Sequence, residues 1–176
     1  MRLTLSILIN IMVFGCFTDE SENMKSLKTV SRVEIERFMG DWYVIANIPT
    51  FLEKNATNAI ESYRLNDKGN IDATFSFYLN SPNGKKKVYH PKGFIYNSTT
   101  NAEWRMQFLW PFKMPFLIID LDDEYSYTVI GYPSRNYVWI MARNPELPEK
   151  TYQSILENLE YVGYDISRIN KVPQIW

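Results

Sequence analysis

The sequence predicts an all-β protein: an eight-stranded up-and-down antiparallel barrel with a C-terminal α-helix packed on its wall. Apolar and aromatic residues recur with a period of two through much of residues 41–143, as they do in strands whose two faces differ. Short segments rich in Asn, Asp, Gly, Ser and Pro separate these runs. One amphipathic helical pattern follows them. The 15% aromatic content also suits strands more than helices.

The alternating runs place the expected strands at 41–48, 57–66, 70–79, 85–96, 102–109, 115–122, 125–132 and 137–143. Because the connections are short, we expect consecutive strands to pair antiparallel. Eight such strands usually close, since closure removes the exposed edges of the sheet. A barrel of this size can hold one small ligand or be filled by its own side chains.

The helix is expected to begin at Pro148, because proline suits the first turn. Its apolar stripe has the spacing i, i+3, i+4, i+7 and consists of Tyr152, Ile155, Leu156 and Leu159. Gly163 is a plausible stop. We also expect a helical turn at 34–38 and a short final strand at 166–172.

The N-terminus has the pattern of a targeting segment. Residues 3–14 are almost wholly apolar and follow the basic Arg2, but the run is shorter than the roughly 20 residues that span a membrane. It ends at Val13-Phe14-Gly15-Cys16, which resembles a bacterial lipobox, in which the cysteine is acylated. The alternative is an ordinary signal peptide with an incidental cysteine. The expected organisation is a signal peptide at 1–15, a lipidated N-terminus and tether at 16–29, and one domain at 30–176.

Composition argues against several function classes. The net charge of −1 gives no electrostatic footprint for nucleic acid. The chain has one Cys and one His, which argues against a cysteine-based zinc cluster and leaves little room for a catalytic triad. No Gly-x-Ser-x-Gly nucleophile motif is present. We therefore expect no enzyme activity, no metal and no cofactor.

The inward-facing side chains of the predicted barrel are the candidate ligand contacts. Strand 102–109 shows its facing most plainly, because apolar residues alternate there with Glu, Arg and Gln. Extended to the other strands, this alternation gives the candidate lining Phe75, Phe77, Trp104, Met106, Phe108, Tyr125, Tyr127, Trp139 and Met141. The alternative is that these side chains fill the barrel as a solid core.

Three segments together resemble one known family. Gly40-Asp41-Trp42-Tyr43 heads the first strand, and 118–125 (IIDLDDEY) and 131–145 (GYPSRNYVWIMARNP) follow in order. They look like the lipocalin family, in particular its bacterial outer-membrane lipoprotein (Blc) branch, kin to apolipoprotein D. The resemblance covers roughly residues 30–172.

The resemblance implies a lipocalin barrel that carries small apolar ligands, anchored to the outer membrane, with its periplasmic face the expected location. Fatty acids or lysophospholipids are the expected ligands. A ring-shaped ligand such as a retinoid, bilin or haem is the alternative, and a lipocalin-fold enzyme a remote one. In this family the residues matching Trp42 and Arg143 meet at the closed end, so Gly40, Trp42 and Arg143 are expected to be structural. Related sequences often carry Asn where Phe75 stands, so a narrower, drier cavity that favours an acyl chain is expected here.

The segment 108–116 (FLWPFKMPF) is too apolar for a solvated turn. It could be a lid over the cavity, a homodimer contact, a rim that touches the membrane, or part of the core.

Overall fold

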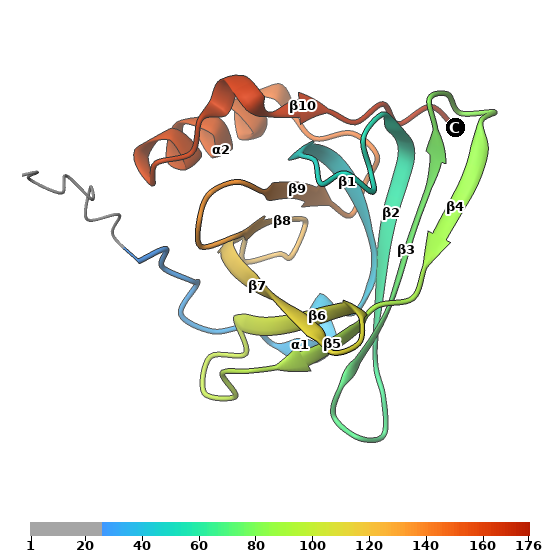
Figure 1. The fold of residues 1–176 in the computed structure, drawn as a ribbon. Coiled ribbons are helices and arrows are strands. Elements are labelled where there is room, and N and C mark those ends of the chain that lie inside the picture. The colour runs from blue at the N-terminus through green and yellow to red at the C-terminus, as the bar shows by residue number, and fades with distance from the viewer. Residues whose placement is uncertain (1–25) are drawn as a thin grey trace, which may run out of the picture.

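The computed structural model describes residues 26–176. The expected signal peptide and Cys16 lie outside the described residues. The described chain forms a closed antiparallel barrel that is seen nearly end-on in Figure 1, with a C-terminal helix on its outer wall. None of the helices within residues 26–176 is long and apolar enough to cross a membrane.

The barrel wall follows chain order. Consecutive strands pair antiparallel, except that β4 and β5 both pair with β3 and not with each other, and β1 pairs with β9 to close the ring. The strands are β1 Gly40–Ile48, β2 Ala56–Leu65, β3 Ile71–Leu79, β4 Lys85–Tyr89, β5 Lys92–Ile95, β6 Glu103–Leu109, β7 Phe112–Leu121, β8 Tyr127–Gly131 and β9 Val138–Ala142. β4 and β5 both pair with β3 and together take the place of one strand in the wall. The predicted eight-stranded up-and-down barrel is therefore confirmed.

The expected single strand at 85–96 is interrupted in the structure. Pro91 lies at the break and has no backbone N–H, so it cannot donate to a ladder. Its carbonyl instead accepts a hydrogen bond from the Ala73 N–H (3.1 Å). β4 then pairs with the second half of β3, while β5 pairs with the start of β3 and with β6.

The two helices cover different parts of the barrel, one its end and the other its outer wall. The four-residue α1 (Ile35–Phe38) lies across one end, where Phe38 is fully buried. The long helix α2 (Glu149–Tyr161) packs on the outer wall through three buried side chains of its predicted stripe, Tyr152, Ile155 and Leu159, while Leu156 is partly buried against the same core. The predicted positions of both elements are confirmed.

The expected final strand at 166–172 is mostly not a strand. A 3₁₀ turn, η1 (Ile166–Arg168), occupies its first half, where the Asp165 side chain accepts from the Ser167 N–H (3.1 Å). Only β10 (Asn170–Lys171) pairs with β1. The local hydrogen bond of the Asp165 side chain favours this turn over an extended strand.

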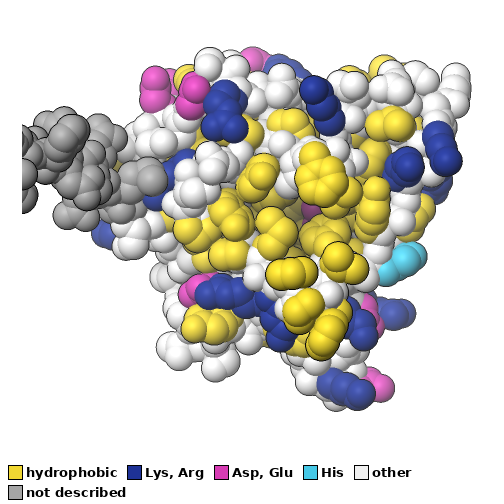
Figure 2. Space-filling model, in the orientation of Figure 1, with side chains coloured by type: hydrophobic (Ala, Val, Ile, Leu, Met, Phe, Trp, Pro, Cys, Tyr) yellow, Lys and Arg dark blue, Asp and Glu magenta, His cyan; other side chains and the backbone are white. Residues whose placement is uncertain are grey.

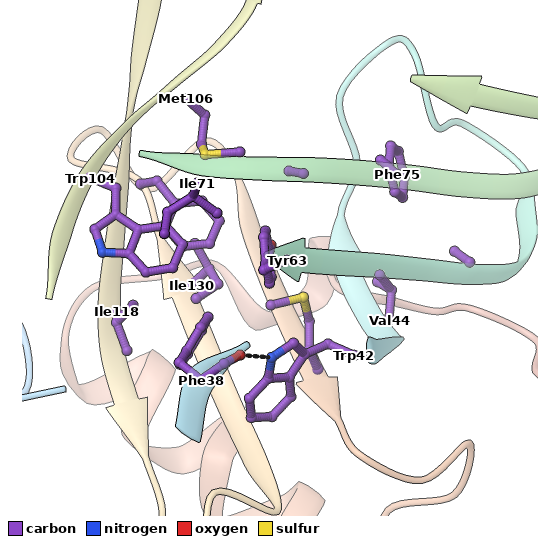
Figure 3. Close-up of a cluster of buried hydrophobic side chains, with 14 of the residues drawn as sticks. Phe38, Trp42, Val44, Tyr63, Ile71, Phe75, Trp104, Met106, Ile118 and Ile130 are labelled. Atoms are coloured by element: carbon purple, nitrogen blue, oxygen red, sulfur yellow. Dashed lines mark hydrogen bonds between the residues drawn. The ribbon is translucent and has the colours of Figure 1, made fainter. Parts of the chain in front are cut away.

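Apolar side chains form two cores, one inside the barrel and one between the wall and α2. A bulge in β1 changes its facing, so that Val44 belongs to the inner core while Ala46 and Ile48 belong to the outer one. β9 is buried on both faces because α2 covers its outer face, with Met141 inside and Ile140 against the helix. Figure 3 shows part of the inner core, where aromatic rings from α1, β1, β2 and β6 meet.

Candidate functional site

The candidate site is a cavity of about 390 Å³ in the half of the barrel that lies away from α1. Its walls come from β2, β3, β4, β6, β7 and β9 and from the loops at 49–55 and 132–137. Most of the lining is apolar or aromatic: Phe51, Leu52, Phe75, Tyr89, Met106, Phe108, Leu109, Phe112, Met114, Pro115, Phe116, Tyr132, Tyr137 and Trp139. Such a lining suits an apolar guest of small size.

The structure brings together four of the predicted contact residues. Phe75, Met106, Phe108 and Trp139 all line the cavity. They come from β3, β6 and β9. On β3 and β6 the alternation of apolar and polar residues matches the actual inward and outward faces, whereas β9 is apolar throughout. That each touches a ligand stays a prediction.

Three further predicted residues are inside the barrel but fill it instead of lining the cavity. Trp104 is fully buried, with its ring stacked on Phe116 at a centroid distance of 5.1 Å. Phe77 and Met141 are also fully buried in the inner core and are absent from the cavity wall.

The end next to α1 is a solid core, in which Trp104 packs against Phe38 and Tyr63. Phe77 lies beyond Phe75 on β3, where its ring packs against the cavity-wall residues Phe75 and Tyr89. The cavity occupies the end away from α1.

The other two predicted residues do not line the cavity: Tyr125 is buried with the inner core, and the alternation gives the wrong face only for Tyr127. Tyr125 lies in the turn before β8 with φ of 58°, and its hydroxyl accepts from the Glu34 N–H (2.8 Å) at the α1 end. Tyr127 packs against the outer core beneath α2. The Asp122 carboxylate accepts from the Tyr127 N–H (3.0 Å) and fixes a tight turn there, so the strand begins only at Tyr127 and with the opposite facing.

The α1 end is closed by Arg143. Its guanidinium lies 3.8 Å from the centroid of the Trp42 ring and donates to the carbonyl oxygens of Arg37, Met39 and Asp41 (2.7, 2.9 and 2.8 Å). Gly40 has φ of +97°, a backbone region that favours glycine, and a Cβ there would lie 3.3 Å from the guanidinium. The arrangement implied by the resemblance is thus present, and all three residues lie away from the cavity.

Two acidic side chains at the cavity were not expected from the sequence. Glu53 from the 49–55 loop and Glu61 from β2 are more than nine-tenths buried, and both line the cavity. Glu61 was missed because it occupies an inward position that an apolar pattern would give to a hydrophobic residue. The sequence does contain a sign that Glu61 points inward: Tyr63 follows it by two residues on the same strand, so the two side chains share one face.

The two carboxylates differ in their hydrogen bonds. Glu53 accepts from the Thr50 N–H (2.9 Å) with Oε1 and from the Trp139 indole N–H (3.0 Å) with Oε2. Glu61 accepts from the Tyr63 hydroxyl with Oε2. Burial raises the pKa of the Glu61 carboxyl to about 7, the Tyr63 hydrogen bond acts against this shift, and the Glu53 charge adds to it. Burial also raises the pKa of Glu53.

The mouth of the cavity is apolar and exposed. Phe51 (88% exposed) projects from the 49–55 loop, and Leu109 and Phe112 flank a tight hairpin whose tip is Trp110 (81% exposed). The segment 108–116 is therefore the β6–β7 hairpin, and its second strand begins at Phe112, three residues before the expected start. Figure 2 shows hydrophobic side chains gathered on this face, with lysines and arginines at its margins.

A second hollow, of about 720 Å³, lies outside the barrel between α2, the β7–β8 wall and residues 26–29. Its lining mixes polar residues such as Lys28, Asp120 and Asn158 with apolar ones. It borders the end of the described chain. We place the candidate ligand site inside the barrel, where the walls are nearly all apolar. Within the described range, no group of three His, Cys, Asp or Glu side chains could hold a metal ion.

Comparison with known proteins agrees with this architecture. The family model of the lipocalin-like domain matches residues 33–174. Temperature-induced lipocalin-1 of Arabidopsis thaliana is 31% identical over 161 residues, covering 85% of this chain and 84% of the relative. The outer membrane lipoprotein Blc of Vibrio cholerae is 26% identical over 175 residues, which is 99% of each chain. Mouse apolipoprotein D is 31% identical over 153 residues, covering 80% of this chain and 77% of the relative.

Solved structures show the same fold. Insecticyanin from the tobacco hornworm Manduca sexta superposes with a TM-score of 0.69 at 19% identity, over 85% of both chains. The matched family model, the identity to named lipocalins and the closed barrel with its helix agree with one another. The chain belongs to the lipocalin family.

Proposed function

We propose that this protein is a non-enzymatic carrier that holds one apolar ligand, a fatty acid or the acyl chain of a lysophospholipid, in the barrel cavity. The observation that carries the proposal is the aromatic and aliphatic lining of the 390 Å³ cavity, open at a mouth of exposed apolar residues. Burial of an acyl chain against such walls contributes about 0.8 kcal/mol per methylene. Phe75 narrows the cavity and keeps it apolar, which favours a chain over a bulky polar guest.

We further propose that the carrier works at the cell envelope, on the periplasmic face of the outer membrane. The relatives named outer membrane lipoprotein Blc support this placement, as does the lipobox-like sequence that ends at Cys16. Two or more acyl chains on this cysteine would anchor the protein stably, whereas one chain is marginal.

The cavity proposal is tested by placing a charge on the inner face of β6. Met106→Arg puts a long charged side chain into the space that an acyl chain would occupy, so it should abolish binding of a long-chain fatty acid. The matched control is Gln107→Arg, because Gln107 is the next residue on the same strand and belongs to the outward-facing polar set. Titration monitored by tryptophan fluorescence should show binding by wild type and Gln107→Arg and none by Met106→Arg. Equal affinity in all three would remove the support for a cavity carrier.

The anchor is tested separately. Cys16→Ser should release the protein from membranes or leave the precursor uncleaved. Membrane retention with normal processing in that variant would contradict acylation at Cys16.

A further inference from the structure

The starting observation is an unused hydrogen-bond acceptor at the inner end of the cavity. Glu61 is 8% exposed and lines the cavity. Its Oε2 accepts from the Tyr63 hydroxyl, whereas no donor within residues 26–176 reaches its Oε1. The Oε1 atom is not sealed in protein, because every fully buried side-chain polar atom in the described chain has a partner. A buried carboxylate oxygen that faces a largely apolar cavity is costly unless a donor meets it.

Glu61 marks the boundary between the hollow and the solid half of the barrel. On β2 it pairs with Trp42 of β1 and Phe75 of β3, and Phe75 is a cavity wall residue. Two residues further along β2, Tyr63 packs against Phe38, Trp104 and Phe116 in the solid half. The end of a ligand that enters first therefore meets Glu61.

The other groups around the cavity do not supply that donor. No Lys, Arg or His from the described part of the chain lines the cavity. The titratable groups that do are Glu53 from the 49–55 loop, Tyr89 from β4, and Tyr132 and Tyr137 from the 132–137 loop, while Tyr63 contacts Glu61 from its own strand. Both oxygens of Glu53 are already engaged, by Thr50 and Trp139. A ligand carboxylate placed at this depth would face two acidic side chains and no cation.

We propose that the preferred ligand carries a hydrogen-bond donor at its buried end, of the class of an ω-hydroxylated fatty acid, with its carboxylate at the mouth and its terminal hydroxyl on Glu61 Oε1. This inference rests on the proposed function and deepens it. A hydroxyl donates one hydrogen bond and is tolerated in a narrow cavity, and a hydrogen bond to a charged acceptor is stronger than one between neutral groups. A plain acyl chain binds in the same cavity but leaves Oε1 unpaired.

The test compares saturated fatty acids with their ω-hydroxy counterparts, using decanoate, dodecanoate and tetradecanoate so that one length reaches Glu61. Titrations of the full-length protein are made above pH 7, where Glu61, with its pKa of about 7, is mostly ionised. For the length that reaches Glu61, wild type should bind the hydroxylated acid at least tenfold more tightly than the plain acid. Glu61→Leu should reverse the order, because the hydroxyl then lies unpaired among apolar walls. Glu157→Leu, the same change on an exposed position of α2, should keep the wild-type order.

The outcomes separate failure of this inference from failure of the proposed function. Binding of the plain acids without any preference for the hydroxylated ones in wild type overturns the inference and leaves the carrier function intact. An equal preference in wild type and Glu61→Leu also overturns it, since the hydroxyl is then held elsewhere. If Glu61→Leu does not fold, Glu61→Gln retains an acceptor and should keep a weaker preference. Failure of every acid to bind contradicts the proposed function, and the inference with it.

Discussion

Single residues decide where this barrel is solid and where it is hollow. Arg143 at the α1 end combines a stacked indole with three carbonyl acceptors, a role that suits the planar guanidinium. Glu61, at the inner end of the cavity, is a buried acid with one oxygen facing the open space. The first residue stabilises the fold, and the second makes stability depend on pH.

Arg143→Ala should weaken the fold more than it weakens ligand binding. The change removes a partly buried cation–π contact and three hydrogen bonds, and we expect a loss of about 1–3 kcal/mol in the free energy of unfolding. Urea unfolding followed by tryptophan fluorescence measures it. Arg64→Ala is the control, because Arg64 is largely exposed and its ion pair with Asp72 is long (3.7 Å). Unchanged urea midpoints together with a collapse of fatty-acid affinity would show that Arg143 serves the ligand instead.

The raised pKa of Glu61 predicts that the fold loses stability as pH rises. In the unfolded chain this carboxyl ionises near its ordinary value of 4.5, whereas in the fold its pKa is about 7. The folded state therefore holds a proton that the unfolded state has released, and the free energy of unfolding falls between these two pH values. The full effect is about 3 kcal/mol, and the raised pKa of Glu53 acts in the same direction.

Glu61→Gln should flatten this pH dependence and raise stability above pH 7. Urea unfolding of wild type and variant at a series of pH values gives the comparison. A wild-type stability that increases from pH 5 to pH 8, or an unchanged slope in Glu61→Gln, would mean that Glu61 ionises normally in the folded state.

Residue-level facing could be predicted from sequence only where the strand is regular. On β6 the alternation of Met106 with charged neighbours gives the correct face. Tyr127 fails because a side-chain cap from Asp122 delays the start of β8, and a one-residue change of phase reverses every side chain. Glu61 could not be found by hydrophobic pattern, since a polar residue at an inward position contradicts the pattern that defines the face.

At the scale of elements, turn residues and proline determine where the strands begin and end, which the apolar periodicity alone does not. The alternation at 85–96 is continuous in the sequence, yet Pro91 divides it into β4 and β5. The apolar segment at 108–116 is divided by the two-residue tip of a hairpin, which leaves Trp110 exposed. The helix was predictable over its whole length, because the period of its stripe and the proline before it agree.

The helix α2 should contribute to stability and not to ligand binding. Ile155 is buried between α2 and the outer face of the barrel, so Ile155→Ala should cost about 2–4 kcal/mol of unfolding free energy. Glu157→Ala, on the exposed side of the helix, should cost little. Urea unfolding gives the stabilities, and fatty-acid titration of the folded variant should give the wild-type affinity. A large loss of affinity in folded Ile155→Ala would show that the helix couples to the cavity through the wall.

At the scale of the whole molecule, closure of β1 onto β9 divides the apolar residues into an inside and an outside. Both of those strands are buried on two faces, because the helix covers the wall that they form. The closed barrel could be predicted from strand number and short connections. The division of its interior could not, because filled and open ends depend on ring sizes, stacking and the position of α1, which periodicity does not encode.

The central claim is that the half of the barrel away from α1 is a ligand cavity of limited size. The direct test is a titration of the protein with saturated fatty acids of increasing length, with the fluorescence of its tryptophans, among them Trp139 in the cavity wall, as the signal. The binding free energy should become more favourable by about 0.8 kcal/mol per added methylene until the cavity of about 390 Å³ is filled. Beyond that length, the affinity should level off or fall. An affinity that does not change with chain length, or no binding at any length, would contradict the claim and would mean that the barrel is not a carrier of acyl chains.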